Sequence, residues 1–327
     1  MKIKKKLILL MMIVTIVLAC LPIAVQASIA KIKPEPKPRT ELLTQIREEA
    51  PKRFIPPINA RLDHVWYAIP GYNGLEVDVE KTYELAQHHS NSPIRYVSRE
   101  VVPAINLHDL GPNPIYRGNP NKRMASLMIN VAWGDEFIPK ILDVLEKEQV
   151  RATFFFDGSW LSKHIDTAKI IAGKGHELSN HAYSHKNMSQ LSKAQALKEI
   201  EKTEDLLRNQ LGVNNKLFAP PSGDYSKETV KIADALHLKT ILWTVDTVDW
   251  RHPSPDSIIS KIAKHVESGS LILMHPTNSS SRALKGMIQE IKRKGLILNT
   301  VSEVISTQRT PDASPLILGE PVLRNPV

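Results

Sequence analysis

Apolar and polar positions alternate in blocks along most of the chain. From Ser126 onward, short apolar runs typical of buried strands are followed by segments with the apolar spacing of amphipathic helices. The first run covers residues 127–131, and from Ile138 apolar side chains recur at the i, i+3, i+4 and i+7 spacing of a helix. This order is typical of βα units around a parallel sheet or barrel. Four further strands are predicted, over residues 152–156, 238–245, 270–274 and 296–298.

The sequence also marks where some of these helices begin and end. Ser192 and Gln195 form a capping box, in which each side chain satisfies the backbone N–H of the other residue. Gly212 is typical of the residue that ends a helix, because glycine adopts the left-handed conformation without strain. A helix is therefore predicted between these signals. Residues 293–295, Arg-Lys-Gly, are typical of the end of another helix.

The first residues of the chain have the pattern of an export signal. Four lysines precede an apolar run over residues 7–25, and Val25-Gln26-Ala27 offers a cleavage site. The run is also long enough to stay in a bilayer as an uncleaved anchor. In a third interpretation, Val-Leu-Ala-Cys at residues 17–20 resembles a lipoprotein cleavage box with Cys20 lipidated. Residues 1–27 are thus predicted as a signal peptide or membrane anchor, and each interpretation places the folded part outside the cytoplasm, in the cell envelope or secreted.

The other regions of the chain have their own patterns. Residues 28–57 are predicted as a linker, since prolines alternate with charged residues near its start and favour an extended chain. Residues 58–120 are predicted as a small accessory α/β module, with a Pro-Gly-Tyr-Asn-Gly turn followed by apolar residues at period two. The main α/β domain is expected over residues 123–306, and a proline-rich tail over residues 307–327.

Composition and charge exclude several classes of protein. With 42% apolar and 24% charged residues over 327 positions, the chain has the balance of a folded globular protein. A single cysteine excludes an internal disulfide. The net charge of +9 includes four lysines of the predicted signal, so the rest carries 39 basic and 34 acidic side chains. This mild excess gives no indication of nucleic-acid binding, and the sequence gives none of an oligomer.

Several aromatic residues have two open interpretations. Trp66, Tyr67 and Tyr72 lie in the predicted accessory module and could form its core or a surface for a partner. On the second interpretation the module docks an envelope partner and the main domain is its scaffold. Tyr225 and Trp250 could likewise be core residues or a stacking surface for sugar rings.

Two histidines four residues apart, His181 and His185, are the first candidate functional residues. Such a pair can reach one metal ion from a single turn, although surface or helix-capping histidines have the same spacing. Three segments follow at the carboxyl ends of predicted strands or in the loops after them, where α/β folds assemble their sites. They are Phe-Ala-Pro-Pro-Ser-Gly at 218–223, Trp-Thr-Val-Asp-Thr-Val-Asp-Trp at 243–250 and Leu-Ile-Leu-Met-His-Pro at 271–276.

In this order, the segments resemble the motifs of polysaccharide deacetylases of the NodB-homology family, carbohydrate esterase family four, over residues 123–306. The resemblance implies an α/β fold, a distorted (β/α) barrel. It also implies a divalent metal, with zinc as the expected ion, that activates water for attack on the N-acetyl carbonyl of a glycan. An imidazole with a carboxylate partner suits protonation of the leaving amine near neutral pH. The roles implied by position are metal ligands at His181 and His185, a general acid at His275 oriented by Asp249, and an acetyl pocket at Trp250 and Leu273.

The first motif departs from the family pattern. Where the family has two aspartates, a catalytic base and a third metal ligand, this chain has Ala132 and Trp133. The arginine that pairs with the base is replaced by Ala219. An arginine without its carboxylate would be an unpaired buried charge, so the joint loss is physically consistent. The variant motif and Tyr-Asn-Gly-Leu-Glu-Val-Asp at 72–78 resemble the YlxY-like branch of spore-forming bacilli, which points to sporulation.

These replacements predict weak or absent deacetylation. A positioned base contributes about 10²–10⁴ in rate. Catalytic zinc usually has three protein ligands, so two imidazoles should hold it weakly. Asp135, Glu136 or Asp157 could supply a substitute carboxylate, although acids at such positions are also typical of helix caps. Trp133 is expected instead to fill the space that the metal site vacated.

Two functions are compatible with this pattern. In the first, the protein is a cell-envelope deacetylase, a hydrolase that releases acetate from N-acetylated glycans such as peptidoglycan or chito-oligosaccharide with an altered metal site. In the second, it is catalytically inactive and keeps the groove for binding a glycan or another envelope partner.

Overall fold

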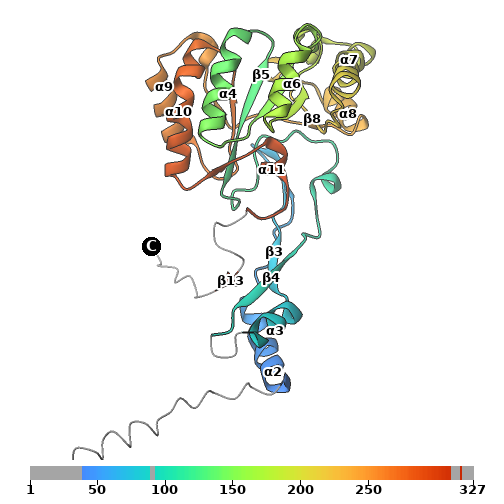
Figure 1. The fold of residues 1–327 in the computed structure, drawn as a ribbon. Helices are drawn as coiled ribbons and strands as arrows, with labels where there is room; N and C mark the ends of the chain where they lie inside the picture. Colours follow the sequence, from blue (N-terminus) through green and yellow to red (C-terminus); the bar gives the residue numbers. More distant parts are fainter. Residues whose placement is uncertain (1–38, 89–92, 311–316, 319–327) are drawn as a thin grey trace, which may run out of the picture. The chain divides into compact units, whose positions relative to one another are not determined.

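The chain forms two compact units in a computed structural model (Figure 1). The described residues are 39–88, 93–310 and 317–318. Among them, the smaller unit comprises those within 39–50 and 78–97 together with Leu318, and the larger unit those within 51–77 and 98–317. The predicted signal or anchor lies outside the described residues, as does most of the predicted tail. Within the described part of the chain, no helix has the length and apolar character needed to cross a membrane.

The smaller unit is built on two helices. Helix α3 begins after Asp78, whose side chain accepts a hydrogen bond from the backbone N–H of Lys81 at 3.0 Å. The cap marks the start of α3, and α2 and α3 contact each other. Its elements are α2 (Arg39–Glu49), α3 (Val79–Gln87) and the start of β4 (Tyr96–Val101).

Helix α2 corrects part of the predicted linker. The sequence predicts an extended linker over residues 28–57, whereas 39–49 form α2 and 50–53 form the short 3₁₀ helix η1 (Ala50–Arg53). The physical reason is that the chain has no proline between Pro38 and Pro51, so its extended bias ends where α2 begins.

A parallel sheet forms the centre of the larger unit. Its strands run in the order β10-β11-β5-β6-β7-β8-β9, with β12 also paired to β5, and the sheet curls into a half barrel. The predicted α/β fold is therefore confirmed. The strands are β5 (Met124–Val131), β6 (Thr153–Phe156), β7 (Glu177–Asn180), β8 (Leu217–Phe218), β9 (Lys239–Thr240), β10 (Val245–Asp246), β11 (Leu271–Met274) and β12 (Ile297–Leu298).

Helices cover the sheet in the order of its strands, with α10, α4, α6 and α7 following one another in Figure 1. The predicted capping box of Ser192 and Gln195 starts α7, and Gly212 ends it with a φ of 66°. The helices are α4 (Ile138–Lys147), α5 (Gly158–Leu161), α6 (Ile165–Gly173), α7 (Lys193–Leu211), α8 (Lys227–Ala235), α9 (Pro255–His265), α10 (Asn278–Arg293) and α11 (Val301–Ile305). The short 3₁₀ helices are η2 (Leu107–Leu110), η3 (Asp135–Phe137), η4 (Met188–Gln190), η5 (Pro221–Gly223) and η6 (Asp249–Arg251).

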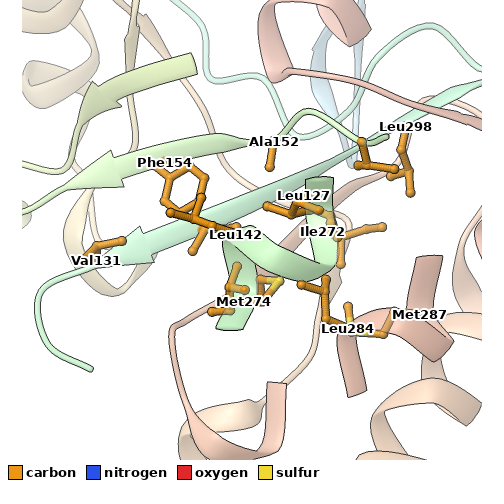
Figure 2. Close-up of a cluster of buried hydrophobic side chains, with 14 of the residues drawn as sticks. Leu127, Val131, Leu142, Ala152, Phe154, Ile272, Met274, Leu284, Met287 and Leu298 are labelled. Carbon is orange, nitrogen blue, oxygen red and sulfur yellow. The ribbon is translucent and has the colours of Figure 1, made fainter. Parts of the chain in front are cut away.

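Both faces of strand β5 are buried, which explains why its sequence is apolar throughout. Alternate side chains enter two separate cores. Leu127 and Val131 pack with Leu142 of α4 in the core beneath the helices (Figure 2), whereas Met124 and Met128 pack in the second core with side chains of α11. The strand is thereby fixed from both sides, and the loop after it starts from a rigid base.

One predicted strand is two strands in the structure. The apolar run over residues 238–245 divides into β9 and β10, which lie at opposite ends of the sheet order. The backbone N–H of Leu242 donates to the carbonyl of Ile115, and that of Thr244 donates to the carbonyl of Leu271. The change of partner within this strand-like segment left no mark in the sequence pattern.

Most of the predicted accessory module belongs to the same unit as the sheet. Residues 58–77 and 98–120 group with the sheet, whereas 78–97 belong to the smaller unit. Hydrogen bonds explain this, since Ile115 donates to the carbonyl of Thr240 and accepts from Leu242. The strands of this region are the hairpin β1 (Arg61–Asp63) and β2 (Tyr67–Ile69), and β3 (Gly74–Val77), which pairs antiparallel with β4; a last strand is β13 (Ile317–Leu318).

Candidate functional site

Four ring side chains meet at the carboxyl edge of the sheet. Trp133 follows β5, His181 and His185 follow β7, and His275 follows β11. The Trp133 ring stacks on His275 with centroids 5.3 Å apart and planes 14° apart, and its edge meets His185 at 6.2 Å. The two histidines of the pair lie edge to face at 5.2 Å. The structure thus brings the predicted histidines together with Trp133, the residue predicted to stand in place of a family aspartate.

A glycine allows Trp133 to reach His275. Gly134 has a φ of 79°, and a Cβ at this position would lie 1.9 Å from the carbonyl oxygen of Pro276. Only glycine permits so close an approach between the loop after β5 and the loop after β11. This contact places Trp133 and His275 side by side.

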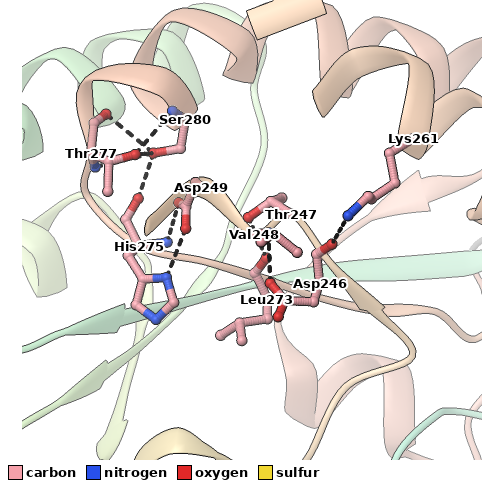
Figure 3. Close-up of polar contacts among 9 residues, drawn as sticks. All are labelled: Asp246, Thr247, Val248, Asp249, Lys261, Leu273, His275, Thr277 and Ser280. Atoms are coloured by element: carbon pink, nitrogen blue, oxygen red, sulfur yellow. Dashed lines mark hydrogen bonds and ion pairs between the residues drawn. The ribbon is translucent and has the colours of Figure 1, made fainter. Parts of the chain in front are cut away.

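His275 is paired with Asp249, as Figure 3 shows. The carboxylate accepts two hydrogen bonds, one from the backbone N–H of His275 at 2.7 Å and one from its ring Nδ1 at 2.8 Å. Asp249 is fully buried and His275 is 9% exposed. The two bonds fix the ring and leave Nε2 as its remaining polar atom.

The loop that carries Asp249 is tied to β11. Thr247 donates from its backbone N–H and its hydroxyl to the carbonyl of Leu273, at 3.1 and 2.9 Å (Figure 3). Val248 then adopts a φ of 55°, which is rare for a β-branched residue. The turn at Val248 directs the Asp249 carboxylate back to His275.

His181 is held by the loop after β8. Its Nδ1 hydrogen-bonds the carbonyl of Ala219 at 2.7 Å, so Nδ1 carries the proton and Nε2 has a free lone pair. Burial, and next the neighbouring His185, lowers the pKa of His181 to about 3. The neutral imidazole fits a metal ligand or a hydrogen-bond acceptor.

Asp157 is the carboxylate that acts electrostatically on the histidine pair. Burial lowers the pKa of His185, and the Asp157 carboxylate acts in the opposite direction. One oxygen of Asp157 caps α5 by accepting from the backbone N–H of Trp160 at 3.0 Å. The other oxygen is buried without a hydrogen-bond partner. Asp157 therefore combines the predicted helix cap with an electrostatic contact to the site.

In the described part of the chain, the residues around the histidine pair do not form a three-ligand metal centre. Asp135 and Glu136 are exposed in η3. No group of three His, Cys, Asp or Glu side chains in the described ranges is arranged to hold a metal ion. Trp133, the residue predicted to replace the third ligand, has an indole ring and no atom that binds a metal ion. Such a site lacks the ligand set that catalytic zinc requires.

The residues predicted for an acetyl pocket differ in exposure. Leu273 is 3% exposed, whereas Trp250 is 47% exposed with the Arg251 guanidinium 4.6 Å from its ring centroid. Both adjoin the paired residues, since Trp250 follows Asp249 and Leu273 lies two positions before His275. Ala132 is half-buried and Ala219 is fully buried.

Backbone strain at the rim was not visible in the sequence. Ala182, His185, Ser222 and Val248 all have a positive φ, between 52° and 58°. Each such residue costs on the order of 1–3 kcal/mol, and such positions cluster at functional sites. A glycine or an asparagine would have indicated a positive φ from the sequence, but the four positions hold neither residue type.

Comparisons with known proteins relate the chain to polysaccharide deacetylases. A family model described as polysaccharide deacetylase matches residues 117–241. The chain is 41% identical to the uncharacterized protein YlxY of Bacillus subtilis, over 82% of this chain and 84% of that protein. It is 34% identical to a peptidoglycan-N-acetylglucosamine deacetylase of Bacillus cereus, over 59% of this chain and 72% of that protein.

Among solved structures, the chain is similar to BA3943 of Bacillus anthracis, described as a CE4 family pseudoenzyme. The identity is 40%, the match covers 82% of this chain and 96% of that chain, and the TM-score is 0.75. A BA3943 mutant described as having restored enzymatic activity matches at 39% identity over 82% of this chain and 99% of that chain, also with a TM-score of 0.75.

Proposed function

This chain belongs to the polysaccharide deacetylase family, carbohydrate esterase family four, and from that premise we propose that it binds N-acetylated glycan in the cell envelope with little or no deacetylation. The predicted family membership is confirmed. One observation carries the proposal: the ring of Trp133, the residue that the resemblance predicts in place of a carboxylate, stacks on His275. A hydrolytic base and a metal ligand are thereby exchanged for an aromatic surface.

The loss of both aspartates removes the chemistry of hydrolysis. Family deacetylases depend on a metal, and the site here offers two neutral imidazoles in place of a three-ligand set. A missing base alone lowers the rate by about 10²–10⁴. The description of BA3943 as a pseudoenzyme, and of its mutant as restored, supports the same interpretation for this chain.

The remaining groups suit binding of an N-acetylated sugar. Trp133 and Trp250 are 45% and 47% exposed, and such faces can pack on the C–H face of a sugar ring. Nε2 of His275 can hydrogen-bond the acetamide group, because Asp249 occupies Nδ1. In this proposal Leu273 gives the acetyl methyl an apolar contact.

The proposed location is the outer side of the cytoplasmic membrane. It is supported by the export pattern in residues 1–27 and by relatives that act on peptidoglycan. We propose that the protein is either released after cleavage of the signal or attached to the membrane, through residues 7–25 or through lipidated Cys20. A role in sporulation is also proposed, from the resemblance to the YlxY-like branch. Fractionation of cells producing Cys20→Ala separates the lipid anchor from the other two modes.

Glycan binding in the presence of a chelator tests the proposal. We expect calorimetry to give the same affinity for an N-acetylglucosamine oligomer with zinc and with EDTA. Trp133→Ala should weaken binding in both conditions, and Phe54→Ala, which removes an exposed ring elsewhere, should not. Affinity that EDTA abolishes would contradict the proposal.

A second candidate is a weak deacetylase with an altered metal site. It is favoured by the intact His275–Asp249 pair and by the neighbouring His181 and His185 rings. It predicts acetate release from N-acetylated chito-oligosaccharide or peptidoglycan with zinc, and none from His275→Ala. Absence of acetate with zinc, cobalt or manganese would retire this candidate.

A further inference from the structure

Four aromatic side chains form a second cluster, outside the histidine site. Tyr67 stacks on Tyr116 with ring centroids 5.7 Å apart and planes 21° apart, and Trp66 tilts against Tyr116 at 6.3 Å. The hydroxyl groups of Tyr116 and Tyr225 are 3.0 Å apart. We call Trp66, Tyr67, Tyr116 and Tyr225 the aromatic platform. It unites the β1–β2 hairpin, the segment before β5 and the loop after η5.

The platform is fixed to its surroundings on several sides. Asp63 closes the hairpin turn by accepting from the backbone N–H groups of Trp66 and Val65, and these bonds lower its pKa to about 2. The Arg117 guanidinium lies 5.7 Å from the Trp66 ring centroid and pairs with Glu267 at 2.9 Å. The rings are therefore preorganised, so a ligand would not have to order them.

Packing alone does not account for Tyr67. The residue is 43% exposed, yet it adopts a φ of 52°, a conformation that costs a tyrosine free energy. A buried core residue would recover that cost through the hydrophobic effect, whereas Tyr67 leaves much of its ring in water. A strained, exposed and stacked ring is typical of a binding surface.

The platform connects with the candidate site through one short loop. Tyr225 follows Ala219 by six residues, and the carbonyl of Ala219 holds the His181 ring. A fully extended chain of that length spans about 20 Å, and η5 shortens the path. The platform and the histidine pair therefore lie within reach of one oligosaccharide.

We propose that the aromatic platform is a further sugar-binding subsite, which stacks a pyranose ring of the same N-acetylated glycan strand that enters the histidine site. This inference rests on the proposed glycan-binding function. A sugar presents one apolar C–H face and a rim of hydroxyl groups, which matches flat rings edged by tyrosine hydroxyls. Burial and the Tyr116 hydroxyl raise the pKa of Tyr225, so its hydroxyl stays neutral and can donate or accept.

The size of the platform favours a sugar over a protein partner. An aromatic side chain buries about 150–250 Å² in full, and here only part of each ring faces solvent. The exposed total falls well below the roughly 800 Å² per partner of a stable protein interface. One or two sugar rings, however, fit such an area.

Oligomer length separates this subsite from the histidine site. We expect Tyr67→Gly to bind a hexamer of N-acetylglucosamine about tenfold more weakly than the unaltered protein, and to bind the dimer equally well. Tyr67→Phe, which keeps the ring, should match the unaltered protein with both. Glycine relieves the positive φ, so thermal unfolding of Tyr67→Gly should show a fold at least as stable and exclude misfolding as the cause.

Each alternative result has a distinct meaning. Equal hexamer affinity of Tyr67→Gly and the unaltered protein, with Trp133→Ala still weakened, overturns the subsite and leaves the proposed function standing. Weaker binding of both dimer and hexamer by Tyr67→Gly also overturns it, because the effect would not depend on chain length. Failure of the unaltered protein to bind the hexamer overturns both proposals.

Discussion

The two halves of the candidate site differ in what holds them in place. His275 and Asp249 are buried and joined by two hydrogen bonds, one of them to the backbone. Trp133 is 45% exposed, and its ring contacts lie on the surface of the site. Loss of one member of a buried polar pair costs far more stability than a change in an exposed loop. Activity can thus be lost in the first-motif half without damage to the fold.

Restoring the family residues should have the largest effect. The triple variant Ala132→Asp, Trp133→Asp, Ala219→Arg restores the residues that the family resemblance predicts as the base, the third metal ligand and the partner of the base. With zinc present, we expect acetate release to rise by about 10²–10⁴ from the base alone. A matched variant with asparagine at 132 and 133 should stay inactive. A folded, zinc-binding triple variant without activity would show that the two halves no longer fit each other.

Removal of the buried carboxylate should have the next largest effect. Asp249→Ala leaves the backbone N–H and Nδ1 of His275 without an acceptor inside the protein. We expect the free energy of unfolding to fall by about 3 kcal/mol or more, as measured by urea denaturation. Asp249→Asn keeps one acceptor and should lose less. A loss under about 1 kcal/mol for the alanine variant would remove the contrast between the halves.

His176 lies at the opposite end of β7 from the site histidines, and it should make the stability of the protein depend on pH. His176 accepts a hydrogen bond at Nδ1 from the backbone N–H of Ala152, and burial lowers its pKa from 6.5 to about 4, with Lys174 and Arg151 acting in the same direction. The unfolded chain therefore binds more protons between pH 6.5 and 4. Stability should be complete above this range and fall by on the order of 2–3 kcal/mol across it.

His176→Asn isolates this effect from that of His181, which is also buried. Asparagine offers an acceptor for the Ala152 N–H and does not titrate. The stability of His176→Asn should therefore depend less on pH between 6.5 and 4 than that of the unaltered protein, as measured by thermal unfolding at several pH values. An unchanged pH dependence would assign the whole effect to the site histidines.

The smallest expected effect on stability is that of Trp133. Trp133→Ala removes a ring that is 45% exposed, so we expect a change within about 0.5 kcal/mol in urea denaturation. The same variant should lose glycan affinity. A destabilisation comparable with that of Asp249→Ala would mean that both halves of the site support the fold.

Local patterns were sufficient to predict much of the fold. The apolar run of β5 and the caps of α7 depend on nearby residues, and both lie where the sequence predicts them. The run over 238–245 was wrongly taken as one strand, because its partners Ile115 and Leu271 are distant in the chain. Helix α2 was missed because nearby prolines dominated the pattern.

The site could be predicted in part. Motif order placed His181, His185 and His275 near one another, and the structure brings them together around Trp133. The stacking of Trp133 depends on the close approach of Gly134 to Pro276, which no local pattern encodes. The functional roles of these residues stay predictions.

Zinc titration of the purified protein shows whether the histidine pair still holds a metal ion. We expect no stoichiometric high-affinity zinc site in the unaltered chain and a clear gain in affinity for Trp133→Asp, which adds a carboxylate beside His181 and His185. Tight binding of one zinc ion by the unaltered protein, lost in His181→Ala, would contradict the account.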